Sequence, residues 1–120
     1  MNKFKIHFLN TIWSDAIILE KDKHYCFIDT ASLFYYPMIK EYLDKNKITH
    51  IDFILLTHFH SDHYSNIVNL INDYDVDTLY IKKYANNEGS TGAGYESNEE
   101  YLAHELTKYN EIMEASKKIK

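Results

Sequence analysis

Four residues of metal-binding type lie within six consecutive positions of the chain. Their pattern is His-x-His-x-Asp-His, and they are His58, His60, Asp62 and His63. They follow the apolar run 51–56, which has the composition of a buried strand, and precede a segment with helical spacing of its apolar residues. Two histidines that are two positions apart at a strand end can point to the same side. Since neutral imidazole and carboxylate bind zinc and similar ions, the segment predicts a metal centre.

The chemistry expected of such a centre is hydrolysis. Asp62 and His63 lie on the turn into the helix, where they can serve a second ion beside the one held by the histidine pair. Two ions can share a water molecule, lower its pKa and generate hydroxide at neutral pH. The pattern is expected by chance roughly 0.002 times in a chain of this length and composition. The alternative is a solvated surface turn in which Asp62 caps the helix.

The elements that must position this segment alternate between strand and helix patterns. Three strands with short turns are typical of an antiparallel meander, and two helix–strand units follow them. The order βββ-α-β-α-β predicts an α/β fold in which helices cover a mixed sheet. The expected strands are 3–9, 15–20, 24–29, 51–56 and 78–81, and the expected helices are 37–45, 64–72 and 97–119.

Two of these elements carry expectations about packing. In the first strand, Phe4, Ile6 and Phe8 alternate with polar residues, which predicts that these three side chains are buried. In the last helix four apolar residues share one face, namely Leu102, Leu106, Tyr109 and Met113. We expect this face to pack against the sheet, and the alternative is docking on another chain.

Composition and charge exclude several classes of protein. The 120 residues are 45% hydrophobic, which is too rich for a disordered chain, and no apolar run approaches the roughly 18 residues of a membrane span. The single cysteine, Cys26, cannot form an internal disulfide, and the amino terminus has no signal-peptide pattern. A reducing compartment, most simply the cytoplasm, is therefore expected. The net charge of -5 and the absence of arginine argue against nucleic-acid binding.

The glycines divide the chain. All three fall within residues 89–94, and the segment 88–95 is predicted to be a flexible glycine-rich loop or linker. Residues 1–87 then hold the strands, the first helices and the metal motif. Residues 96–120 form the amphipathic helix, in which Ser97 and Glu100 have the spacing of a capping box.

The motif and its flanks resemble the metallo-β-lactamase superfamily, whose signature is H-x-H-x-D-H after a hydrophobic strand. Within it, the chain is most similar to the branch of hydrolase domains found in competence (DNA-uptake) proteins. That branch begins H-F-L-D-V-G-Q-G-D-A-I-L-I, and residues 7–19 read HFLNTIWSDAIIL. Its I-D-T-G motif appears as IDTA at 28–31, and its I-D-x-L-I-L-T-H strand as IDFILLTH at 51–58. The resemblance covers about residues 4–82.

The resemblance implies roles for residues at matching positions. His58 and His60 resemble ligands of the first metal ion, and Asp62 and His63 resemble ligands of the second. Asp62 also matches the residue that orients or deprotonates the attacking water. Asp29 matches a structural aspartate near the site, and Asp15, outside the metal set, matches an early structural aspartate of the branch. The implied cofactor is one or two Zn²⁺ ions, with Mn²⁺ or Fe as alternatives.

The chain departs from the family pattern in its loops and in its length. The early G-Q-G motif of the branch reads Ile12-Trp13-Ser14, the D-T-G glycine is Ala31, and the two glycines usual after D-H-x are Ser65 and Asn66. These changes affect the expected substrate loops more than the metal ligands. The family's later ligands, a His after Gly, a bridging Asp and a final His, are missing, because the only histidine beyond His63 is His104 within the last helix. The resemblance therefore covers the N-terminal half of the family's αββα sandwich.

These observations predict a metal-dependent hydrolase in which metal-bound hydroxide attacks a phosphodiester, ester or amide. Because the later ligands are missing, we expect this 120-residue chain to be incomplete and weakly active or inactive. The partners expected are a small ester or phosphodiester substrate and either a second copy or the missing C-terminal half, with no membrane. The alternative is a non-catalytic binding or self-assembling module that retains the family's first half.

Overall fold

The computed structural model describes residues 4–9, 14–59, 61–82 and 98–119. The strands are β1 (Phe4–Phe8), β2 (Ile17–Lys21), β3 (His24–Ile28), β4 (His50–Leu55) and β5 (Asp75–Tyr80). The helices are the 3-10 turn η1 (Leu33–Tyr35), α1 (Tyr36–Lys45), α2 (Ser61–Tyr64), α3 (Ile67–Asp73) and α4 (Asn98–Ser116). Among these residues, no helix combines the length and the apolar character needed to cross a membrane.

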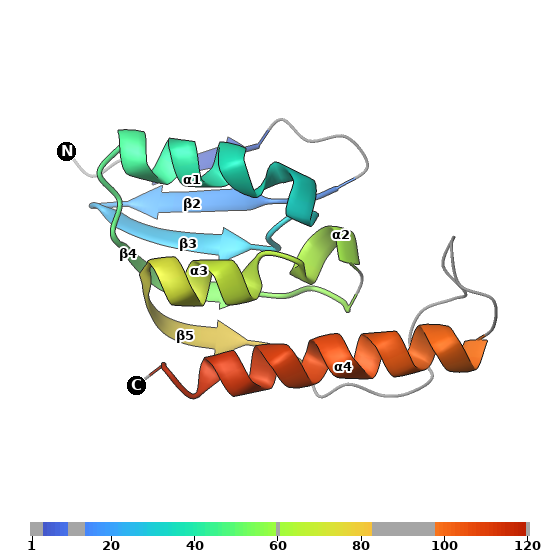
Figure 1. The fold of residues 1–120 in the computed structure, drawn as a ribbon. Coiled ribbons are helices and arrows are strands. Elements are labelled where there is room, and N and C mark those ends of the chain that lie inside the picture. The colour runs from blue at the N-terminus through green and yellow to red at the C-terminus, as the bar shows by residue number, and fades with distance from the viewer. Residues whose placement is uncertain (1–3, 10–13, 60, 83–97, 120) are drawn as a thin grey trace.

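The strands form one sheet in which the spatial order is the chain order, β1-β2-β3-β4-β5 (Figure 1). The first three strands pair antiparallel, whereas β3, β4 and β5 pair parallel. The predicted mixed α/β architecture is therefore confirmed. Because β3, β4 and β5 run in the same direction, their carboxyl ends share one edge of the sheet, and the antiparallel strand β2 begins at that edge. Such edges commonly hold binding sites in α/β folds.

The core lies between the sheet and the helices on one of its faces (Figure 1). Ile18, Phe27 and Ile54 stand side by side across three strands, and all three are fully buried. The covering helices contribute four more fully buried side chains, Ile39 and Leu43 from α1 and Ile67 and Leu70 from α3. Burial of each of these side chains stabilises the folded state by about 1.5–3 kcal/mol. This layer therefore holds the ends of the strands in fixed positions.

The other face of the sheet carries no helix or strand among the described residues (Figure 1). The predicted burial of Phe4, Ile6 and Phe8 is wrong, because they lie on this face and are 59%, 50% and 75% exposed. Alternation showed that they share a face but not which face the helices cover. The covered side of β1 is that of His7, whose ring contacts Tyr42 of α1. Cys26 lies half-buried on the open face, and burial raises the pKa of its thiol.

Two helix predictions need correction. The helix expected over 64–72 is two helices, because Asn66 between α2 and α3 bonds to another loop. The last helix packs against α3 rather than on the sheet (Figure 1). Its predicted face is confirmed at Tyr109, which packs against the core, but is wrong at Leu106 and Met113, which are 42% and 37% exposed. The buried residues of this helix include Glu105, Ile112 and Ala115. Residues 88–95 and the Ser97 cap lie outside the described residues.

Helix α1 ends with a backbone pattern that usually needs glycine. The Ile48 N–H donates to the Leu43 carbonyl at 2.8 Å, and the Lys47 N–H donates to the Asp44 carbonyl at 3.1 Å. This pair of bonds defines a Schellman motif, and it places Lys47 in the left-handed region with φ 57°. Ile48 and Leu43 are both buried and supply the apolar contact typical of the motif. The lysine backbone bears a conformational cost of about 1–2 kcal/mol here.

Candidate functional site

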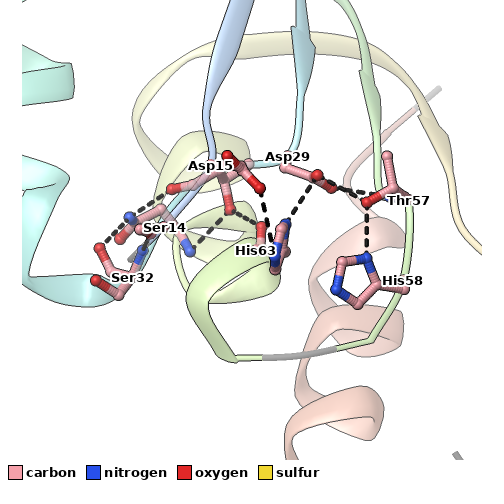
Figure 2. Close-up of polar contacts among 9 residues, drawn as sticks. Ser14, Asp15, Asp29, Ser32, Thr57, His58 and His63 are labelled. Atoms are coloured by element: carbon pink, nitrogen blue, oxygen red, sulfur yellow. Dashed lines mark hydrogen bonds and ion pairs between the residues drawn. The ribbon is translucent and has the colours of Figure 1, made fainter. Parts of the chain in front are cut away.

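The candidate site lies at the sheet edge where β3 and β4 end and β2 begins. Asp29 directly follows β3, Thr57 and His58 follow β4, Asp15 precedes β2, and His63 lies on α2. Figure 2 shows Asp29 between Thr57 and His63, with the His58 ring near that of His63. The sheet edge therefore brings together polar residues from four separate segments of the chain.

Asp29 is the centre of the hydrogen bonds. Its side chain is only 5% exposed. Its Oδ1 accepts the Thr57 backbone N–H at 2.8 Å, and its Oδ2 accepts the Thr57 hydroxyl at 2.7 Å. The same Oδ2 lies 2.9 Å from Nδ1 of His63, which is also buried. An ionised carboxylate only accepts hydrogen bonds, so Nδ1 of His63 must carry the proton. The lone pair of a neutral His63 ring then lies on Nε2.

Thr57 links Asp29 to His58 and fixes which nitrogen of the His58 ring carries the proton. The Thr57 hydroxyl gives its hydrogen to Asp29, and its oxygen lies 2.9 Å from Nδ1 of His58. With its own hydrogen already used, the hydroxyl can only accept from His58, so Nδ1 of His58 is protonated too. The ring centroids of His58 and His63 are 4.0 Å apart. Both imidazoles therefore keep Nε2 as the nitrogen able to bind a metal ion, the arrangement that outer hydrogen bonds impose on histidine ligands.

Asp15 places a second carboxylate beside His63. Its Oδ2 lies 3.7 Å from Nε2 of His63, and its side chain is 67% exposed (Figure 2). Nε2 and the carboxylate face each other, an arrangement of donor atoms that can hold a metal cation between them. The resemblance placed Asp15 outside the metal set, and the structure adds it to the polar residues of the site.

A buried network holds the α2 segment against the loop that follows β3. The backbone N–H and the hydroxyl of Thr30 both donate to the His63 carbonyl, at 2.7 and 2.8 Å. Asn66 is fully buried, and its side-chain amide donates to the carbonyls of Thr30 and Ser32 at 2.7 and 2.9 Å. Ala31, at the position of the motif glycine, adopts a left-handed φ of 62°. Ala31 and Asn66, which stand where the family pattern has glycine, thus belong to the structure that supports His63.

Two of the four predicted ligands can be placed in detail. His58 and His63 converge as described above. His60 lies outside the described residues, as does the side chain of Asp62, whose backbone belongs to α2. The structure therefore brings together the first and last members of the motif.

A cavity of roughly 300 Å³ lies beside α2. It is open between α2, α3 and α4, and its lining includes Ser61, Val68, His104, Lys108 and Ile112. Ser61 is within the metal motif, so the cavity begins next to the candidate site. His104, the only histidine beyond the motif, belongs to this cavity lining.

The resemblance indicated Asp29 as a structural aspartate near the site, but sequence reasoning missed the other residues that orient the histidines. Thr57 carried a usable signal, because it directly precedes His58 and follows the buried strand. Thr30 is far from the motif in sequence, whereas Asn66 is three positions after His63. The roles of both depend on the packing of α2 against the loop after β3. No local pattern marks such contacts.

Comparisons with known proteins agree with this architecture. The family model described as "Metallo-beta-lactamase superfamily" matches residues 14–112. Among solved structures, the chain is similar to BJP-1, a subclass B3 metallo-beta-lactamase of Bradyrhizobium japonicum, with a TM-score of 0.52 and 23% identity. That match covers 61% of this chain and 28% of BJP-1, so the chain spans less than a third of that protein's length. A search of curated proteins finds no match. Since the family match covers most of the chain, the protein belongs to the metallo-β-lactamase superfamily.

Proposed function

We propose that this chain contributes the first half of the metal centre of a metal-dependent hydrolase. The observation that carries the proposal is the shared orientation of His58 and His63, whose Nδ1 atoms are both committed to the Asp29–Thr57 pair. Histidines used only for surface solvation do not need this support. The other two proposed ligands are His60 and Asp62, which complete the His-x-His-x-Asp-His pattern between them.

The donor set fits a divalent metal ion. Three imidazoles and a carboxylate suit Zn²⁺, and Mn²⁺ or Fe accept the same donors. Asp29 contributes by holding His63 in the tautomer that leaves Nε2 to bind the ion. Asp15 is a further candidate because its carboxylate already faces that nitrogen. Members of the superfamily generally bind such ions, so the donors and the family agree.

The reaction proposed is hydrolysis of a phosphodiester, ester or amide. A bound divalent ion would lower the pKa of water and polarise the bond to be broken. We assign to Asp62 the role of orienting the attacking water and accepting its proton, which requires it to be close to that water. The cavity beside Ser61 would hold part of the substrate, and its open side would admit it.

The finer assignments follow from the sequence patterns. The segments 7–19, 28–31 and 51–58 favour the competence-type branch. We propose a cytoplasmic location on the strength of the single cysteine. We retain the division into a half domain at 1–87, a glycine-rich loop at 88–95 and a helical segment at 96–120.

We expect the 120-residue chain by itself to turn over slowly or not at all, because it spans 28% of the related solved chain. The missing ligands would come from a second copy or from a C-terminal half. The test is hydrolysis of bis(p-nitrophenyl) phosphate by the chain supplied with Zn²⁺ or Mn²⁺. Any turnover should be lost in Asp62→Asn and retained in Asp22→Asn, which makes the same change in the hairpin turn between β2 and β3.

Equal rates in the two variants would show that the turnover does not use this site. A chain that binds metal but does not turn over would fit the half-site, and addition of the missing half should then restore the reaction. A chain that neither binds metal nor turns over would contradict the proposal.

A second function is favoured by the open face of the sheet. This face exposes four large apolar side chains to at least half of their area, namely Phe4, Ile6, Phe8 and Tyr80. Together they form a larger exposed apolar area than single surface residues do. A non-catalytic module that binds a partner or its own copy would use this face. Absence of metal together with concentration-dependent association in sedimentation experiments would favour this function.

A further inference from the structure

We propose that the open face of the sheet carries a second divalent-metal site, formed by His50, Asp75 and Asp77. Each of these residues offers one ligand atom, and the three atoms lie within 4.8 Å of one another. Nδ1 of His50 is 3.0 Å from Asp75 Oδ2, and its Nε2 is 2.9 Å from Asp77 Oδ2. The chemical class of the ligand is a divalent transition-metal ion such as Zn²⁺.

The site is built on paired strands. His50 opens β4 and Asp75 opens β5, and the two face each other in the parallel register. Asp75 and Asp77 flank the buried Val76, so both point away from the helices. Donors fixed on neighbouring strands lose less freedom on binding an ion than donors on a loop do. An ion here would therefore link β4 to β5 across the open face.

The charge around these donors also favours a cation. Asp52 Oδ1 lies 3.4 Å from Nε2 of His50, and Asp52 Oδ2 lies 2.7 Å from Nδ1 of His24. Three carboxylates thus gather around two imidazoles. Within the described part of the chain, the ion pairs of these carboxylates are made with the histidines and not with lysine. Lys23 and Lys47 line the adjacent hollow together with His50.

The donor chemistry narrows the identity of the ion. Imidazole nitrogen with carboxylate oxygen suits Zn²⁺ and related ions, whereas Ca²⁺ and Mg²⁺ prefer oxygen alone. Bonds of about 2.0–2.2 Å would place the ligand atoms roughly 3–3.5 Å apart. The three ligand atoms now lie within 4.8 Å of one another, so the carboxylate that faces the other ring nitrogen would turn toward the nitrogen that binds the ion. Without an ion, His50 must be protonated to donate to both Asp75 and Asp77, so Zn²⁺ would replace a proton at this position.

This site is separate from the candidate hydrolytic centre. His50 begins β4 and Thr57 follows its end, so the strand rise puts them roughly 20 Å apart. Its occupation therefore does not depend on the function proposed for His58 and His63. A role in stabilising the pairing of β4 with the edge strand β5 follows from its position.

The test is Zn²⁺ titration by calorimetry on a chain carrying His58→Ala and His60→Ala, which removes the other centre. We expect about one ion per chain, and at least tenfold weaker binding when Asp77→Asn is added. Glu41→Gln, on the exposed side of α1, is the control and should leave the affinity unchanged. No binding, or binding that Asp77→Asn does not weaken, would overturn the proposal.

A second measurement does not depend on whether the chain carrying His58→Ala and His60→Ala folds. In the unmodified chain, addition of Zn²⁺ should shift the NMR signals of the His50 ring carbons and protons. In the presence of Asp77→Asn, the same addition should shift them only at higher Zn²⁺. Unmoved His50 signals at saturating Zn²⁺ would overturn the proposal independently of the calorimetry.

Discussion

Replacement of Thr57 by valine tests how the histidines are oriented. Valine keeps the shape of threonine but lacks the hydroxyl that donates to Asp29 at 2.7 Å and accepts from His58 at 2.9 Å. Hydrogen bonds to charged groups contribute about 1.5–3 kcal/mol, so the free energy of unfolding should fall by about that amount. Loss of an outer hydrogen bond to a histidine ligand weakens metal binding about 10–100-fold. That range corresponds to about 1.4–2.7 kcal/mol.

The assay is competition for Zn²⁺ against a coloured chelator, in chains that carry His50→Gln so that only this centre is measured. Thr57→Ser retains the hydroxyl and should keep most of the affinity. Thr107→Val removes an exposed hydroxyl that donates to the Ala103 carbonyl within α4, so it is the matched control and should leave the affinity unchanged. Equal Zn²⁺ affinity in Thr57→Val and in the unmodified site would refute the reasoning about tautomers.

Three further predictions concern stability and titration. Asn66→Ala removes the side-chain donor from the buried Thr30 carbonyl and one of the two donors of the Ser32 carbonyl, which keeps the Tyr35 N–H. The free energy of unfolding should fall by about 1–3 kcal/mol, and an unchanged urea midpoint would contradict the role of this network. Lys47→Gly relieves the left-handed backbone and should stabilise the fold by about 0.5–1 kcal/mol, whereas Lys45→Gly, at the last residue of α1, relieves nothing and should destabilise the fold by up to about 1 kcal/mol. Burial, and then a hydrogen bond to Asp44, raise the pKa of Tyr74 above its usual value of 10.0. As the pH rises past about 10, the Tyr74 hydroxyl ionises in the unfolded state before it does in the folded state, so the free energy of unfolding is unaffected below that pH and falls above it. Asp44→Asn should lower the pH at which ultraviolet absorbance reports the ionisation of Tyr74.

The order of elements could be predicted because each segment carries its own periodicity. The alternation in β1 and the apolar run in β4 fixed their strand character locally. Alternation cannot say which face the helices cover, and for that reason the burial of Phe4 and Phe8 was predicted wrongly. The break at Asn66 escaped prediction because it depends on carbonyls of residues 30 and 32, which are distant in sequence.

The metal motif could be recognised because its four residues lie within six consecutive positions of the sequence. The second cluster could not, since His50, Asp75 and Asp77 come from two strands that only the parallel register brings together. The register could not be deduced from the composition of either strand.

The central claim is that the segment holding His58 and His63 binds metal ions. The most direct test is the metal content, by plasma mass spectrometry, of tag-free protein carrying His50→Gln, beside the same chain with His60→Ala added. We predict about one or two ions per chain in the first protein and a large loss in the second. No metal in either protein, or equal metal in both, would contradict the claim.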